Sequence, residues 1–169
     1  MTYSEPLRVP QFGAILFRAA ELIGQQGSQA LDALGVDFDA RHTSVLLVLY
    51  TQGPKTSSEL AEIIGHSRQL IEARLKSARG RRVFASRPDP HDTRRRLYEI
   101  AADAQPVAET VHAIMREFEP VYDALWAEVG VDLEQALLKM EARLADKPLI
   151  ERLQDSRAVD RQPTGAESK

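Results

Sequence analysis

Ten basic side chains between Ser67 and Arg96 are the residues with the clearest chemical potential. Only three acidic residues lie in this segment, so its net charge is +7. The rest of the 169-residue chain carries −10, which gives the total of −3. Guanidinium groups bind phosphates and base edges, so a basic block in an acidic chain indicates a nucleic-acid contact surface. A solvated helix face with i,i+4 ion pairs is the alternative, and it needs acidic partners that this segment largely lacks.

Several other function classes lack their characteristic residues. Without cysteine the chain cannot hold a disulfide framework, a thiolate zinc site or a thiol redox sensor. The four histidines show no ligand-type spacing, and no P-loop, dinucleotide fingerprint or nucleophile elbow occurs, so we expect no metal, no cofactor and no enzymatic activity. No apolar run approaches the ~18 residues of a membrane span, and residues 1–6 lack signal-peptide features, so we expect a cytoplasmic protein.

Two short helices are expected to position the first basic residues. Thr56-Ser57-Ser58-Glu59 is a capping box that opens a helix continuing to Ile64. Gly65-His66 ends it, and Ser67 can cap the next helix. That second helix is expected to bury Leu70, Ile71, Leu75 and Ala78. Two short helices joined by a glycine-containing turn of about three residues form a helix-turn-helix.

A basic hairpin follows these helices. Residues 83–87 read as a strand, 88–92 as a turn and 94–100 as the returning strand. A basic hairpin directly after a helix-turn-helix is a wing. The predicted fold class is therefore mainly α with a small β wing: a winged helix-turn-helix between N- and C-terminal dimerisation helices.

Helical periodicity marks the flanking segments. A long first helix is expected over 12–34, with Gly24 and Gly27 as weak points, and Asp37 or Asp39 caps a second helix through Tyr50. Apolar residues between Val107 and Val129 recur at heptad-like spacing, and two shorter helices follow. The expected division is an N-terminal dimerisation helix (1–36), a DNA-binding region (37–101), C-terminal dimerisation helices (102–154) and a disordered tail (155–169).

Three motifs in order carry a family resemblance. They are Gly-Pro-Lys-Thr-Ser-Ser-Glu-Leu-Ala at 53–61, Gly-His-Ser-Arg-Gln at 65–69 and Arg-Pro-Asp-Pro-His-Asp-Thr-Arg-Arg at 87–95. With them the chain resembles the MarR family of bacterial winged helix-turn-helix repressors. Arg82 departs from the glycine usual before the first wing strand. Ala101 and Ala104 replace the usual threonine and glycine at the start of the following helix.

The resemblance and the docking geometry of such motifs imply a set of DNA contacts. Ser67, Arg68 and Gln69, at the start of the second helix, are expected to lie near base edges. The wing places Arg94, with Arg95 or Arg96, at the adjacent minor groove. Lys55, Thr56 and Arg74 are expected to touch phosphates at most. Asp92 is expected to shape the wing by bonding Arg94 or wing amides. Several of these residues also have an explanation that does not involve DNA. Ser67 can be a helix cap, Lys55 and Gln69 can be solvated, and Arg74 can form a structural ion pair. The full set of candidates is Lys55, Thr56, Ser67, Arg68, Gln69, Arg74, Arg94, Arg95 and Arg96.

The resemblance also implies partners. One reading helix covers too few base pairs, so a homodimer on a double-stranded, pseudo-palindromic operator is expected. A small aromatic or phenolic effector would bind between the dimerisation helices and the DNA-binding region. Candidate lining residues, each of which plain core packing also explains, are Phe12, Phe17, His42, Leu46 and Trp126. The alternative function is a helical dimeric regulator that binds a protein partner and no DNA.

Overall fold

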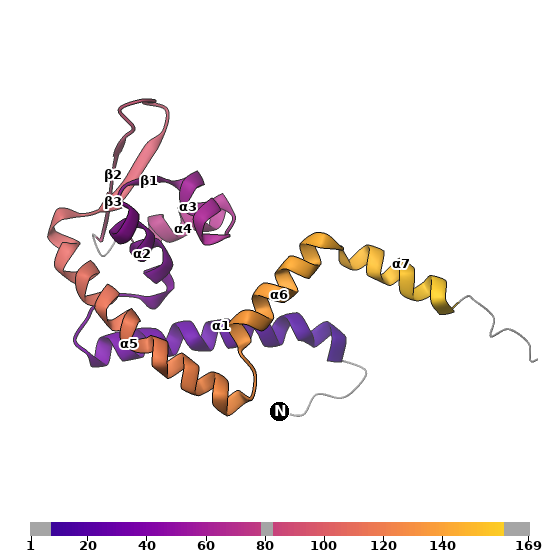
Figure 1. Ribbon diagram of the computed structural model, residues 1–169. Helices are drawn as coiled ribbons and strands as arrows, with labels where there is room; N and C mark the ends of the chain where they lie inside the picture. Colours follow the sequence, from indigo (N-terminus) through magenta and orange to yellow (C-terminus); the bar gives the residue numbers. More distant parts are fainter. Residues whose placement is uncertain (1–7, 79–82, 161–169) are drawn as a thin grey trace, which may run out of the picture. The chain divides into compact units, whose positions relative to one another are not determined.

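The computed structural model describes residues 8–78 and 83–160 (Figure 1). It is mainly helical, with one small antiparallel sheet, so the predicted fold class is confirmed. The chain forms two compact units, Met1–Arg116 and Glu117–Lys169. One long helix, Gln105–Val129, crosses from the first unit into the second.

The first unit contains most of the elements. In chain order they are α1 (Arg8–Ala33), η2 (Ala40–His42), α2 (Thr43–Gln52), β1 (Lys55–Thr56), α3 (Ser57–Ile64), α4 (Arg68–Ala78), β2 (Phe84–Pro88), β3 (Arg96–Ile100), η4 (Ala102–Ala104) and α5 (Gln105–Val129), which continues into the second unit. The second unit adds α6 (Leu133–Asp146) and α7 (Leu149–Asp160).

A close approach ties α1 to η2. The Ser28 hydroxyl accepts a hydrogen bond from the Ala40 amide at 3.0 Å and donates one to the Gly24 carbonyl at 3.1 Å. A Cβ on Gly27 would lie 3.1 Å from the Ala40 Cβ, a distance tighter than ordinary contact. Gly27 is therefore a site of close packing, and α1 continues unbroken through both glycines that were expected to weaken it.

The helix-turn-helix forms as the local signals predict. Thr56 caps α3: its hydroxyl accepts from the Glu59 amide at 3.2 Å, and the Glu59 carboxylate accepts from the Thr56 amide at 2.8 Å. Gly65 ends α3 in the left-handed conformation, with φ of 73°. In α4, Ile71 and Leu75 are buried, but Leu70, which was expected in the core, is 41% exposed. Ile71 and Leu75 are four residues apart and so share a face, from which Leu70 is rotated by about 100°.

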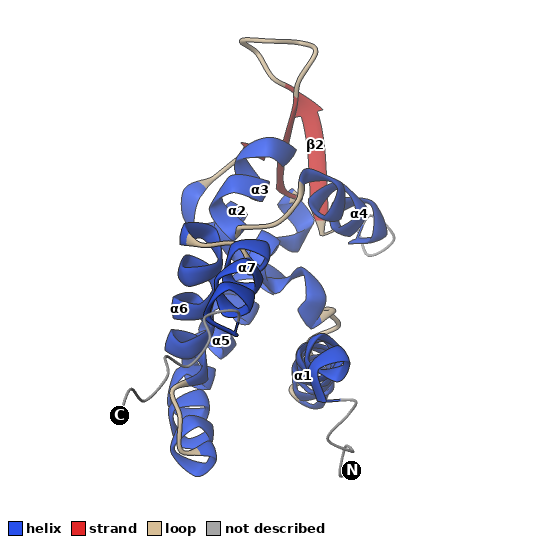
Figure 2. Cartoon of the chain, turned by 90° about the vertical axis from the view of Figure 1, so that its right-hand side faces the viewer, coloured by secondary structure: helices blue, strands red, loops and turns tan. Residues whose placement is uncertain are grey.

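The sheet has the order β1-β3-β2. In the hairpin, Phe84 pairs with Ile100 at the buried end and Pro88 with Arg96 at the exposed end. The two-residue strand β1 was not predicted; Lys55 pairs with Tyr98 and Thr56 with Leu97. Figure 2 shows the hairpin extending away from the helices of the first unit, and the core beneath it includes Phe38, Leu46, Leu60, Ile71 and Val111.

The short helix η4, which leads directly into α5, starts without a side-chain cap at Ala101, as the alanine there predicts. Pro106 lies in the first turn of α5. Its apolar spacing continues to Val129, yet the side chains buried along it are Ala108, Val111 and Ile114, all in the first half.

The second unit corrects the predicted tail. Asp132 caps α6 by accepting from the Gln135 amide at 2.9 Å. The tail was expected to begin at Asp155, but α7 runs to Asp160, so residues 155–160 are helical. Asp155 pairs with Lys147, and Arg152 donates to the last carbonyls of α6, which supports this helix despite its polar composition. Residues 161–169 lie outside the described part of the chain.

Candidate nucleic-acid interface

The first turn of α4 presents two exposed polar side chains. The Ser67 hydroxyl accepts from the Leu70 amide at 3.3 Å, so it caps the helix and sets where the turn begins. Arg68 and Gln69 follow directly and are exposed. A capped helix start with exposed Arg and Gln is suited to base-edge contacts in a major groove.

Glu72 is a neighbour of Arg68 that the sequence reasoning did not single out. Arg68 Nε lies 2.7 Å from Glu72 Oε1, an ion pair four residues apart on α4. The same oxygen accepts from the buried Ser57 hydroxyl on α3 at 3.2 Å. The hydrogen bonds from Arg68 and then Ser57 lower the pKa of Glu72. The i,i+4 spacing was a visible signal for the ion pair, whereas the Ser57 contact joins residues fifteen apart.

Two aspartates shape the hairpin loop. Asp92 Oδ1 accepts from the Arg94 amide at 3.1 Å, the kind of contact expected of it. Asp89, which stands in the third sequence motif and for which no structural role was predicted, is 8% exposed and accepts from the His91 amide at 2.9 Å. Its own amide bonds the Arg95 carbonyl at 3.0 Å. Asx turns of this kind fix the loop, so the exposed Arg94 is carried on a defined backbone.

The other wing arginines have partners within the chain. Arg95 lies 3.8 Å from Glu59 and donates to the Thr56 hydroxyl at 3.4 Å, which joins the hairpin to the start of α3. Arg96 donates to the Ser86 carbonyl and hydroxyl on the paired strand, at 3.1 and 2.8 Å.

The expectation that this basic segment lacks acidic partners is therefore wrong. Glu72 lies inside it, and two partners come from outside: Glu59 meets Arg95, and Glu99 meets Arg87 at 3.1 Å. The hydrogen bonds from Thr56, and to a smaller extent the charge of Arg95, lower the pKa of Glu59. Pairing in space thus offsets part of the charge that appears uncompensated along the chain. Arg81 and Arg82, which add to that charge, lie outside the described residues.

The three candidates for phosphate contact differ in exposure and in the contacts they make within the fold. Thr56 is 4% exposed, and its hydroxyl is engaged in the capping box. Arg74 donates to the Ser44 hydroxyl on α2 at 3.3 Å and is half-buried. Lys55 donates to the Gln52 carbonyl at the end of α2, at 2.6 Å. Each of these three side chains has a contact within the fold.

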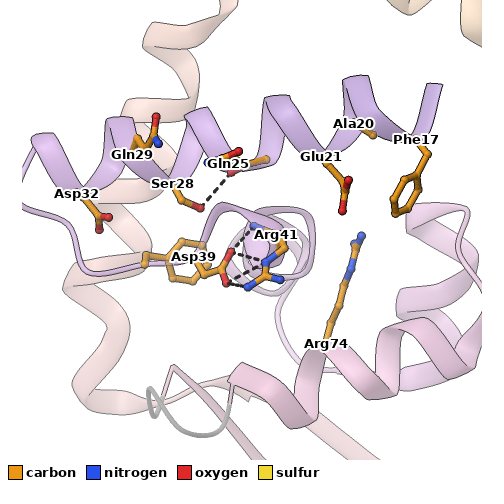
Figure 3. A pocket seen from close by; sticks show the side chains of 12 residues that line it. Phe17, Ala20, Glu21, Gln25, Ser28, Gln29, Asp32, Asp39, Arg41 and Arg74 are labelled. Carbon is orange, nitrogen blue, oxygen red and sulfur yellow. Dashed lines mark hydrogen bonds and ion pairs between the residues drawn. The ribbon is translucent and has the colours of Figure 1, made fainter. Parts of the chain in front are cut away.

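A pocket of about 760 Å³ lies between α1, η2 and α4. Arg74 points into it from α4 toward Phe17 and Glu21 of α1 (Figure 3). Of the five expected lining residues only Phe17 borders this pocket; His42 and Leu46 are core residues, and Phe12 is exposed. Trp126 borders a separate, shallower depression in the second unit.

One wall of the pocket holds a close ion pair between Arg41 and Asp39. The Arg41 Nη2 lies 2.6 Å from Asp39 Oδ2, and the Arg41 amide and Nε also donate to the Asp39 carboxylate. The hydrogen bonds from the Arg41 side chain lower the pKa of Asp39 from 3.8 to about 2, against a smaller opposing effect of burial.

Across residues 8–78 and 83–160, no three His, Asp or Glu side chains cluster closely enough to hold a metal ion. None of the helices there has the length and apolarity needed to cross a membrane.

No protein-family model matches the chain, and no curated protein does. Solved structures do match. The MepR–DNA complex of S. aureus is 18% identical, with a TM-score of 0.60, and covers 80% of this chain and 97% of its own. The repressor CouR bound to a 23-mer DNA duplex is 21% identical, with a TM-score of 0.58, and covers 86% of this chain and 99% of its own.

A mutant of E. coli MarR in complex with operator DNA is 14% identical, with a TM-score of 0.58, and covers 86% of this chain and 100% of its own. At such identities the likeness establishes the fold: this chain has the winged helix-turn-helix architecture of these structures.

The Asp39–Arg41 pair predicts a defined pH dependence of stability. Because the pKa of Asp39 is depressed on folding, its stabilisation is complete above the unfolded value of 3.8 and is lost as pH falls toward about 2. Asp39→Asn keeps a capping side chain and should lower the free energy of unfolding at pH 7 by roughly 1 kcal/mol, after allowing for solvent screening of the exposed Arg41. Urea denaturation from pH 7 to pH 3 should show the difference shrinking.

Asp32→Asn is the matched control, because it removes an exposed carboxylate that lines the same pocket. Its effect should stay within about 0.5 kcal/mol at every pH. A difference for Asp39→Asn that does not change with pH would show that the ion pair is not its cause.

Proposed function

We propose that this chain is a transcriptional regulator that binds DNA, with α4 in the major groove and the β2–β3 hairpin at the adjacent minor groove. The observation that carries the proposal is the capped first turn of α4, where Arg68 and Gln69 are exposed. The structurally similar MepR, CouR and MarR were each solved with DNA, which supports this assignment. The protein acts by binding rather than by catalysis.

The contacts that the arginines make within the fold reduce the number of residues proposed to bind DNA. Arg68 and Gln69 read bases, since their side chains project from the helix start that enters a groove. Arg94, at the loop of the hairpin, enters the minor groove, where narrow A/T tracts concentrate negative potential. Arg95 and Thr56 instead hold the hairpin against α3, and Arg74 belongs to the pocket. Arg96 and Lys55 contribute charge near the phosphates.

The protein acts as a homodimer on a pseudo-palindromic operator, most simply as a repressor. Two reading helices about 34 Å apart are needed to recognise enough base pairs. Large apolar side chains are exposed along α1, where Phe12 is 54%, Phe17 66% and Leu22 51% exposed. The second unit also exposes apolar residues, among them Leu138 and Leu149. Apolar surface on this scale indicates a protein interface.

A small ligand regulates DNA binding from the pocket between α1, η2 and α4. Phe17 offers apolar contact to an aromatic ring, and Arg74 offers a donor to an acidic group. Arg74 lies on α4, six residues after Arg68, so a ligand bound to it acts directly on the reading helix. Ligand binding that shifts α4 would release the operator.

The DNA-binding proposal predicts different effects for two arginines. Arg68→Ala should weaken binding to a selected operator by about 1–3 kcal/mol and relax the base preference at one position. Arg94→Ala should reduce the slope of log K against log salt by about one and weaken the preference for A/T-rich flanks. Fluorescence anisotropy titrations over 50–200 mM salt measure both quantities.

The control is Lys139→Ala, which removes a basic residue of α6 outside the helix-turn-helix and hairpin, and it should change neither quantity. If Arg68→Ala and Arg94→Ala both leave affinity unchanged, the docking arrangement is wrong. If the unmodified protein shows no salt-dependent affinity for DNA, the protein is instead a helical partner-binding regulator.

The dimer proposal predicts twice the chain mass of 18.9 kDa in sedimentation equilibrium at micromolar concentration. Leu22→Glu places a charge on the exposed apolar face of α1 and should weaken dimerisation by about tenfold or more. Gln26→Glu, which adds the same charge at an exposed polar position of α1, should leave the mass unchanged. A monomeric unmodified protein would contradict the dimer.

The ligand proposal predicts that some member of a panel of aromatic carboxylic acids releases the protein from its operator. Arg74→Ala should abolish the release while keeping operator affinity within about twofold, because Arg74 is turned toward the pocket. Lys76→Ala removes an exposed charge from the same helix and should respond to ligand normally. Release of the Arg74→Ala protein at unmodified ligand concentrations would show that the pocket is not the regulatory site.

A further inference from the structure

Arg68 stands at an electrostatically unfavourable place for a cation. It is the first residue of α4, directly after the capping Ser67, where the helix dipole is positive. Its partner Glu72 follows it by four residues, and an ion pair in this order stabilises a helix less than the reverse order does. Helix stability therefore gives little reason for an Arg–Glu pair in this orientation, and a role in recognition gives a better one.

The geometry of the pair leaves part of the guanidinium free for another ligand. Glu72 Oε1 accepts from Arg68 Nε at 2.7 Å. A guanidinium carries five N–H donors, so this contact uses one side of the group and leaves its terminal amino groups for a further partner. The Arg68 side chain is 66% exposed, so such a partner has access.

The carboxylate that holds Arg68 is itself anchored in the fold. Ser57, the first residue of α3, donates to the same Oε1 atom at 3.2 Å and is only 7% exposed. The chain of contacts Ser57–Glu72–Arg68 therefore runs from a buried hydroxyl on one helix to the exposed arginine on the other. A freely solvated ion pair has no such anchor, and its two side chains sample many rotamers.

We propose that Glu72 is a positioning residue for base recognition: it binds Nε of Arg68 and so orients the terminal amino groups to pair with O6 and N7 of guanine. This inference rests on the proposed DNA-binding function. Arginine pairs bidentately with guanine in the major groove through two parallel hydrogen bonds, and pre-orientation reduces the ordering cost of that contact. Glu72 is thereby a determinant of specificity, although it need not touch a base.

The same carboxylate has the opposite effect on binding to unrelated DNA. Its negative charge lies beside Arg68 and repels phosphates, and its hold on Nε limits the ability of Arg68 to reach the backbone. Removing the charge should therefore weaken operator binding and strengthen non-specific binding. A residue that merely contributed charge would shift both affinities in one direction.

The experiment compares two duplexes: an operator selected by the unmodified protein from a random-sequence pool, and an unrelated duplex of the same length. Glu72→Gln should weaken operator binding by about three- to tenfold, part of the roughly five- to 150-fold expected for loss of a bidentate guanine contact. Binding to the unrelated duplex should increase. Glu62→Gln, which removes an exposed carboxylate from α3, is the matched control and should move both affinities in the same direction.

A double-mutant cycle tests whether Glu72 acts through Arg68. In the Arg68→Ala background, Glu72→Gln should no longer weaken operator binding. An operator with 7-deazaguanine at the recognised base should weaken binding of the unmodified protein but not of Arg68→Ala. Ser57→Ala should also weaken operator binding, but by less than Glu72→Gln does. Thermal melting of each variant checks that the fold is intact.

Two outcomes overturn the inference while the proposed function stands: Glu72→Gln changes both duplexes alike, or its operator loss persists unchanged without Arg68. The first would make the contact an ordinary surface ion pair. If the unmodified protein selects no sequence from the pool, the proposed function itself is wrong, and the positioning role falls with it.

Discussion

The structure depends on the chain being held at Thr56, where three elements meet. Thr56 pairs with Leu97 in the sheet, caps α3 through its hydroxyl, and shares the Glu59 carboxylate with Arg95 of the hairpin. At 4% exposure it has little contact with water, so these internal bonds satisfy it. The next residue, Ser57, extends the constraint to α4 through Glu72. Contacts with the two residues Thr56 and Ser57 thus help to orient both the hairpin and α4.

This constraint changes how the charge of the protein is understood. Counted along the chain, residues 67–96 form a block of +7. In space, Glu59 and Glu99 lie against Arg95 and Arg87, so part of that charge serves to hold the wing to the helices. Exposed pairs of this kind contribute little stability individually, about 0–1 kcal/mol each, but they fix geometry. Under the proposed function, the charges best placed to contact DNA are Arg68 at the start of α4 and Arg94 at the hairpin loop.

Local rules were enough to predict some of these features from sequence and not others. The capping box, the Gly65 turn and the Ser67 cap each involve residues no more than four apart in the sequence. At such separations the spacing alone determines which residues can contact one another. Strand β1 was missed because two residues carry no periodicity, and its pairing partner lies about forty residues away. The contacts of Ser57 with Glu72 and of Arg95 with Glu59 were missed because these residues come from different elements, which only the folded chain brings together. The pocket is lined by residues from α1, η2 and α4, so the sequence pattern of a single helix could not predict its lining.

The uneven burial of α5 connects the fold to assembly. Its apolar residues keep heptad-like spacing from Val107 to Val129, so one face of the helix is apolar throughout. The first half buries Ala108, Val111 and Ile114, whereas Val121 and Val129 are each 56% exposed. In the second half Phe118, Tyr122 and Trp126 form a ladder, with Tyr122 and Trp126 stacked at 5.7 Å. In the proposed homodimer, a second copy of this chain, which exposes apolar residues of its own along α1, would cover the remainder of this face.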